Sequence, residues 1–103
     1  MRIGVIAYDY KLSCNACYFL ANLDKDSTIN YSAIDFVVMK DGTIYQAISE
    51  NTERLRGLRL NQIILVDDNR WEVLKKRKTE IGLLIKENCL SDADWQVQKY
   101  DWT

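Results

Sequence analysis

The spacing of apolar residues predicts alternating strands and helices. Residues 2–8 and the unbroken apolar run at residues 62–66 are typical of strands that are covered on both faces. After Ser13, a fair helix N-cap, apolar side chains recur at helical spacing over residues 14–23. The same spacing returns from about residue 70 to residue 88, which predicts a second, longer helix.

A β-hairpin is predicted between the two helices. Residues 33–40 and 43–49 are rich in strand-forming residues, and the Asp41-Gly42 pair separates them. Such a pair is a strong hairpin signal, because glycine adopts the positive φ of a tight turn at little cost. The flanking residues 24–32 and 51–60 are predicted to be polar connections.

The last predicted strand, residues 95–100, has no clean apolar face and is expected at a sheet edge. The order is therefore strand, helix, hairpin, strand, helix, strand, and strand-helix-strand crossovers favour parallel pairing. We predict one α/β domain over residues 1–103, with a mixed, partly parallel sheet, a β-hairpin and two main helices. A chain of 103 residues with 48% hydrophobic content suits one modest core.

The composition excludes several classes of function. Histidine is absent, so the chain can build neither a histidine-based catalytic triad nor a histidine metal site. No apolar run reaches the roughly 18 residues of a membrane helix, and the N-terminus lacks the pattern of a secretory signal. Three cysteines, an odd number, favour a reducing compartment. We therefore expect a cytoplasmic protein without a membrane-spanning segment.

Aspartates follow two of the predicted strands. Asp9 comes after the first strand, and Asp67 and Asp68 come after the central strand. Because functional groups collect at the carboxyl ends of parallel strands, these carboxylates are candidates for a cluster that binds Mg²⁺ or activates water. The alternative is that they end strands and cap the next helix, as Asp68 or Asn69 could. Apart from Mg²⁺ at Asp67 and Asp68, no cofactor is expected.

The Cys14-x-x-Cys17 motif allows two interpretations. Its place after a strand resembles the redox motif of thioredoxins, and a helix N-terminus would lower the pKa of a thiol there. Thioredoxin folds also use a cis-proline, and this chain has no proline. Two small buried residues on a core-facing helix are the favoured interpretation.

Residues 34–69 resemble the region that leads into the Walker B strand of phage terminase large subunits and related helicase-like P-loop ATPases. The similarity includes the turn at Asp41-Gly42, the Arg56-Gly57 step and the apolar strand that ends in Asp67-Asp68, where the family has Asp-Glu. With residues 3–20 the similarity extends from residue 3 to residue 69, a span of about two-thirds of the chain. None of the four glycines is followed by lysine, so the phosphate-binding motif G-x-x-x-x-G-K-[ST] is absent. The resemblance implies a degenerate P-loop-like domain that does not hydrolyse nucleotide.

The middle of the chain is basic. Residues 54–78 carry eight Lys and Arg against three Asp and Glu, whereas both flanking segments are acidic. The basic candidates for binding an anionic partner are Arg54, Arg56, Arg59, Arg70, Lys75, Lys76, Arg77 and Lys78. Residues 75–78 lie in the middle of the second predicted helix, and their side chains point in different directions over roughly a full turn. The simpler interpretation of this basic run is therefore a solvent-exposed helix surface.

These features predict a non-catalytic accessory protein of phage type that acts by binding a partner protein. It would engage or inhibit a nucleic-acid-processing complex or a host defence complex. Two alternatives stay open. One is a magnesium-dependent nuclease or phosphotransfer enzyme that uses Asp9, Asp67 and Asp68. The other is a small nucleic-acid-binding protein that uses the basic middle segment. Self-association into a homo-oligomer is also left open.

Overall fold

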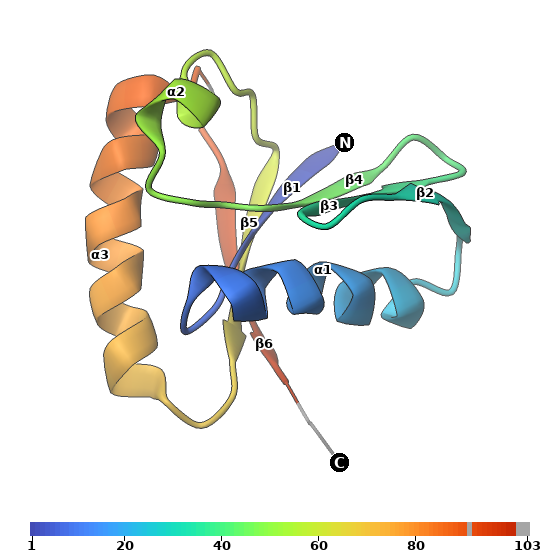
Figure 1. The fold of residues 1–103 in the computed structure, drawn as a ribbon, viewed down its shortest axis with the longest axis horizontal. Coiled ribbons are helices and arrows are strands. Elements are labelled where there is room, and N and C mark those ends of the chain that lie inside the picture. Colours follow the sequence, from blue (N-terminus) through green and yellow to red (C-terminus); the bar gives the residue numbers. More distant parts are fainter. Residues whose placement is uncertain (91, 101–103) are drawn as a thin grey trace.

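The computed structural model describes residues 1–90 and 92–100, which form a six-stranded mixed sheet with helices on both faces (Figure 1). In chain order the elements are β1 (Arg2–Ile6), α1 (Tyr10–Leu23), β2 (Ile29–Ser32), β3 (Phe36–Met39), β4 (Ile44–Ala47), α2 (Thr52–Leu55), β5 (Gln62–Asp67), α3 (Trp71–Asn88) and β6 (Asp94–Lys99). Among the described residues, two of the three helices are long. None of them combines the length and the apolar character needed to cross a membrane.

The strand order in the sheet is β2-β3-β4-β1-β5-β6. Strands β4, β1, β5 and β6 run parallel to one another, while β3 is antiparallel to both of its neighbours. The predicted α/β class, the partly parallel sheet, the hairpin and the two main helices are therefore confirmed. The last strand lies at the sheet edge, as its mixed pattern predicted.

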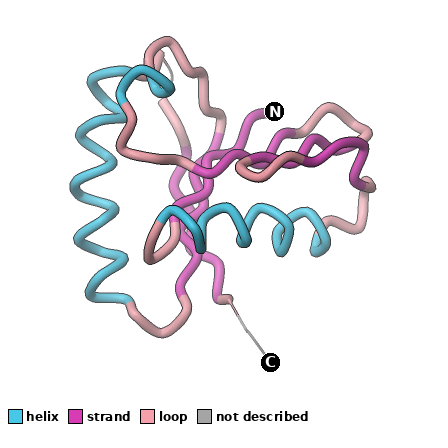
Figure 2. Tube along the Cα trace, in the orientation of Figure 1, coloured by secondary structure: helices cyan, strands magenta, loops and turns pink. Residues whose placement is uncertain are grey.

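Alternation of side chains along the central strands divides the core into two layers. In β1, Ile3 and Val5 belong to the cluster beneath α1, while Ile6 belongs to the cluster beneath α3. In β5, Val66 faces the first cluster and Leu65 the second. Both strands are buried on both faces, which explains their continuous apolar runs. Figures 1 and 2 show α1 lying along the hairpin strands and α3 standing along β5 and β6.

The hairpin between β3 and β4 forms where the sequence predicted it. Gly42 has a φ of 93°, which suits a residue without a side chain. The Asp41 carboxylate accepts a hydrogen bond from the Thr43 amide at 2.9 Å, and the Met39 amide donates to the Thr43 carbonyl at 2.7 Å. These bonds fix the register in which Val38 pairs with Ile44.

The first helix begins earlier than predicted. Its N-cap is Asp9, whose Oδ1 accepts from the Leu12 amide at 2.8 Å, so the prediction that Ser13 is the cap was wrong. Ser13 lies in the first turn, and its hydroxyl donates to the Asp9 carbonyl and accepts from the Ala7 amide, both at 2.9 Å. Ser13 therefore ties the helix back to the end of β1.

Two short elements lie in segments that the sequence predicted as polar connections. Strand β2 occupies Ile29–Ser32 and pairs with β3 at the sheet edge. Helix α2 occupies Thr52–Leu55, and the Asn51 side chain caps it by accepting from the Glu53 amide at 3.1 Å. Leu55, fully buried, anchors α2 in the α3 layer of the core.

Candidate functional site

The carboxyl ends of β1 and β5 lie side by side at the point where the chain changes direction. From β1 the chain continues through α1 to the hairpin strands, and from β5 it continues through α3 to β6, on the other side of the sheet order. In open α/β sheets, ligands commonly bind at such a switch point. Asp9, Asp67 and Asp68, which we call the acidic edge, lie there, so the prediction that they follow parallel strands is confirmed.

Asp67, the last residue of β5, is buried and bonded on both oxygens. Its Oδ2 accepts from Lys99 Nζ at 2.8 Å, and its Oδ1 accepts from the Asn69 amide at 3.0 Å. Asp67 and Lys99 are also direct partners in the parallel register of β5 and β6. Asn69 has a φ of 78°, a left-handed conformation that asparagine tolerates better than most residues. Asp67 therefore holds the turn that leads from β5 to α3.

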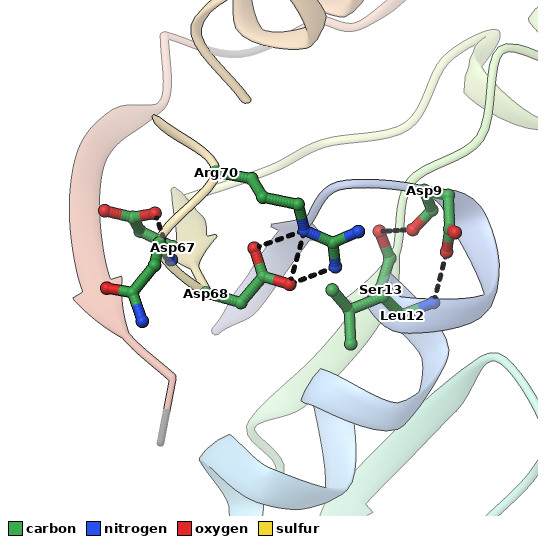
Figure 3. A network of polar contacts seen from close by, with 7 residues as sticks. Asp9, Leu12, Ser13, Asp67, Asp68 and Arg70 are labelled. Atoms are coloured by element: carbon green, nitrogen blue, oxygen red, sulfur yellow. Dashed lines mark hydrogen bonds and ion pairs between the residues drawn. The ribbon is translucent and has the colours of Figure 1, made fainter. Parts of the chain in front are cut away.

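Asp68 forms an ion pair with Arg70, as Figure 3 shows. Both carboxylate oxygens accept from Arg70 Nε, at 2.9 and 3.0 Å. The hydrogen bond from Arg70 lowers the pKa of Asp68, and the same bond raises the pKa of Arg70. The Arg70 guanidinium also lies over the Tyr8 ring, 3.6 Å from its centre, which is a cation-π contact. This pair links the end of β5 to the end of β1.

Each carboxylate of the acidic edge thus already has a partner within the chain. Asp9 caps α1, Asp67 binds Lys99, and Asp68 binds Arg70. A metal ion on Asp67 and Asp68 would have to displace both cations. Residues 1–90 and 92–100 contain no group of three His, Cys, Asp or Glu side chains placed to hold a metal ion. The arrangement is suited to fixing the two loops at the switch point.

A hollow of about 410 Å³ lies beside the acidic edge. It is lined by Tyr8, Asp9, Val73, Lys76, Arg77 and Glu80. Arg77 reaches from α3 to Glu50, with Nη1 donating at 2.7 Å, while its Nε and Nη2 are buried and have no partner among the described residues. Sequence reasoning missed Glu50 and Tyr8. Both follow parallel strands closely, so the rule that selected Asp9 could have found them.

Cys14 and Cys17 lie on the buried side of α1, and both thiols are free. Burial raises the pKa of both thiols, most strongly for Cys17, so they stay protonated near neutral pH. A redox cysteine needs a lowered pKa and access to its partner. The structure therefore supports the interpretation that these cysteines are core residues.

The basic candidates do not gather into one patch. Arg54 pairs with Asp35 at 2.9 Å and Arg70 with Asp68, while Lys76 and Arg77 line the hollow beside the acidic edge. Lys75 and Lys78 line a separate groove on another side of α3. This division within the run 75–78 agrees with the prediction that its members point around the helix. Arg56 and Arg59 are exposed on the connection from α2 to β5.

An uncovered surface lies on the hairpin half of the sheet. Helix α1 packs on one face of β3 and β4, and Figure 1 shows α2 and α3 beside β5 and β6, away from the other hairpin face. We call this surface the open sheet face. It consists of Arg2, Tyr31, Asp35, Phe36, Val38, Ile44, Gln46 and Arg54.

The centre of the open sheet face is apolar. Phe36, Val38 and Ile44 are partly exposed around a hollow of about 350 Å³. The Tyr31 ring extends this strip, with its centre 5.9 Å from that of Phe36. The charged residues in its lining are Arg2, Asp35 and Arg54, and Asp35 is paired with Arg54. No residue of this face except Arg54 was among the predicted site residues.

Comparisons with protein-family models, with curated proteins and with solved structures found no match to this chain. The resemblance to the Walker B region therefore stays a prediction.

Proposed function

We propose that this protein is a non-catalytic accessory protein that binds a partner protein through the open sheet face. The observation that carries the proposal is the apolar, aromatic strip that the protein's own helices leave uncovered. Antiparallel strands with one solvated face normally alternate apolar and polar residues. In β3, Val37 and Met39 are buried beneath α1, yet the alternate positions are Phe36 and Val38, which are also apolar.

The composition of the open sheet face suits a protein interface. Tyrosine, phenylalanine and arginine are enriched at the centres of protein interfaces. Here Tyr31 and Phe36 provide large apolar surfaces, and Tyr31 is 59% exposed. If a partner covered this strip, each Å² of apolar surface removed from water would contribute about 25 cal/mol of favourable free energy to binding. A contiguous apolar surface is more typical of an interaction site than of ordinary protein surface.

The charged residues around the hollow indicate what kind of partner would bind the open sheet face. Arg54 is 59% exposed, and its hydrogen bonds to Asp35 and Tyr10 both use Nη1. A carboxylate on the partner could therefore bind the rest of this guanidinium. Arg2 also lines the hollow, and its Nη1 donates to Gln46 Oε1. We accordingly propose a partner whose docking surface is apolar and carries a carboxylate that faces Arg54.

The acidic edge gives the enzyme alternative less support, because each of its three carboxylates is engaged by the protein itself. We further propose a phage-type role, in which the protein inhibits a nucleic-acid-processing complex or a host defence complex. This part of the proposal rests only on the resemblance to the Walker B region.

The proposal is tested by comparing three immobilised proteins: the wild type, Val38→Asp and Asn22→Asp. Asn22 is exposed on α1, so its variant introduces the same charge away from the open sheet face. Extracts of the natural host cells are passed over each protein, and bound proteins are quantified by mass spectrometry. We expect a protein that the wild type and Asn22→Asp retain and that Val38→Asp loses. Identical sets of bound proteins on all three would contradict the proposal.

A further inference from the structure

A groove of about 560 Å³ lies between α3 and β6, at the opposite end of the sheet from the hairpin. Its lining includes Lys75, Lys78 and Lys86 from α3 and Trp95 from β6. We call it the lysine groove. In the sequence, Lys75 and Lys78 belong to a basic run, whereas Lys86 and Trp95 lie well outside it.

The three lysines form a row along one side of α3. Residues three and eleven positions apart return to nearly the same side of a helix that has 3.6 residues per turn. At a rise of about 1.5 Å per residue, Lys75 and Lys86 are separated by about 16 Å along the axis. Lys76 and Arg77, although adjacent to them in sequence, line a different hollow. The row therefore exists only on the helix surface, and the basic run at residues 75–78 does not reveal it in the sequence.

The charge of the groove is mostly positive. The ion pairs found among the described residues involve none of the three lysines. Among the lining residues that the structure describes, Asp92 is the acidic one and none is an arginine. Lysine binds phosphate as a point charge, whereas arginine's planar fork binds both carboxylates and phosphates through two hydrogen bonds. The three lysines thus make the groove suited to anionic groups such as phosphates.

Trp95 is half-buried: it packs against the core beneath α3 and also lines the groove beside the lysine row. Lys78 Nζ lies 5.5 Å from the centre of the Trp95 ring. A Cβ atom added at Gly82 would lie 3.8 Å from the ring, in ordinary van der Waals contact, so the indole lies close to this turn of α3. Nucleobases stack on such rings, and every base has a face that can do so. A chain of carboxylates would instead bring negative charge toward the negative face of the indole.

From the lysine row and the adjoining indole, we infer that the lysine groove binds single-stranded nucleic acid, with phosphates along Lys75, Lys78 and Lys86 and a base against Trp95. A positive groove with an aromatic platform is the usual arrangement for binding single strands without sequence preference. The inference does not depend on the open sheet face, which lies on the hairpin strands.

The binding test uses a fluorescein-labelled oligothymidylate of about ten nucleotides, a length within typical single-strand sites. Fluorescence anisotropy at low salt is measured for the wild type, Lys78→Glu and Lys76→Glu. The two variants carry the same charge change at exposed positions of one helix, but only Lys78 lines the groove. We expect Lys78→Glu to weaken binding about tenfold and to flatten the salt dependence, whereas Lys76→Glu changes affinity by less than about twofold.

Two further measurements refine the test. Asp92→Asn is expected to tighten binding about twofold or more, because it removes the opposing carboxylate from the groove. In a Trp71→Phe, Trp102→Phe background, the oligonucleotide is expected to quench the fluorescence of Trp95. Equal losses for Lys78→Glu and Lys76→Glu, or no binding at low salt, would overturn the inference. So would a polyglutamate peptide that competes as strongly as the oligonucleotide, or unchanged Trp95 fluorescence on saturation.

Discussion

The acidic edge and the open sheet face differ in how completely the protein's own residues bind or cover their side chains. At the acidic edge, Asp67 and Asp68 are bonded to Lys99 and Arg70, so their charges are balanced from within. On the open sheet face, Phe36 and Val38 remain partly exposed although the opposite face of the same strand is fully covered. The first region is conspicuous in the sequence, whereas the second becomes visible only in the fold.

This difference indicates where to look for function in a small α/β domain. A carboxylate at a switch point is a candidate ligand for a metal or a substrate only while its oxygens are free. An apolar surface that no helix covers keeps the free energy of burial available for a partner. The predictions below test whether the two regions differ in this way.

The largest expected contrast lies within β3, between adjacent valines on opposite faces. Val37 is fully buried beneath α1, so Val37→Thr would bury a hydroxyl in the core and should lower the free energy of unfolding by about 1–3 kcal/mol. Val38→Thr, on the open sheet face, should change it by less than about 0.5 kcal/mol. Urea denaturation of both variants measures the difference. Equal destabilisation would show that the open sheet face is covered within the folded protein.

Removing the Asp67 carboxylate is expected to destabilise the fold by a somewhat smaller amount. Asp67→Ala leaves the Asn69 amide without its acceptor and removes the partner of Lys99, which should cost about 1–2 kcal/mol in chemical denaturation. Asp67→Asn serves as the control, because its side-chain oxygen can still accept from the Asn69 amide. If both variants were as stable as the wild type, the structural role of Asp67 would be wrong.

A smaller effect is expected from the Asp68 and Arg70 pair as a function of pH. Because Arg70 lowers the pKa of Asp68 in the folded state, the pair's contribution is fully present above the unfolded-state pKa of an aspartate. It is lost as the pH falls through the lowered folded-state pKa. Arg70 is exposed and solvent screens its charge, so the contribution of the pair should be small.

The contribution of this ion pair is measured by comparing the free energies of unfolding of the wild type and Asp68→Asn at neutral and acidic pH. The wild type should be the more stable of the two at neutral pH, and the difference should shrink as the solution is acidified through the titration of Asp68. A difference that is constant over this range would argue against the ion pair.

Magnesium is expected to have the smallest effect. A metal present at a hundred times its Kd would stabilise the folded state by about 2.7 kcal/mol, which a thermal melt detects readily. Since Lys99 and Arg70 occupy the carboxylates, we expect millimolar Mg²⁺ to leave the melting temperature unchanged at constant ionic strength. A magnesium-dependent rise that Asp67→Asn abolishes would favour the enzyme alternative.

Much of the fold followed from local sequence signals, but the shorter elements did not. Asp41-Gly42 located the hairpin, and the apolar run before Asp67 located β5. Strand β2 was missed because its four residues are mostly polar, and edge pairing with β3 stabilises a segment whose own pattern is weak. Asp9 was recognised as a candidate carboxylate, yet its role as the cap of α1 was assigned to Ser13.

The candidate site was predictable in position but not in its contacts. The carboxyl-end rule placed Asp67 and Asp68 correctly, because it depends only on parallel strands. The Lys99 partner could not be foreseen, since it depends on the register between β5 and a strand that follows an entire helix. The open sheet face was hidden for a similar reason. Apolar residues on both sides of β3 predict burial on both faces, and only the positions of the helices show which face is uncovered.

The most direct test of the account measures the affinity of the partner captured in the host extract for two variants, by calorimetry with purified proteins. Val38→Asp alters the open sheet face, and Asp68→Asn alters the acidic edge. The account predicts that Val38→Asp weakens binding by about 2 kcal/mol or more, as at an interface hot spot, while Asp68→Asn binds like the wild type. Loss of binding by Asp68→Asn with full retention by Val38→Asp would contradict it.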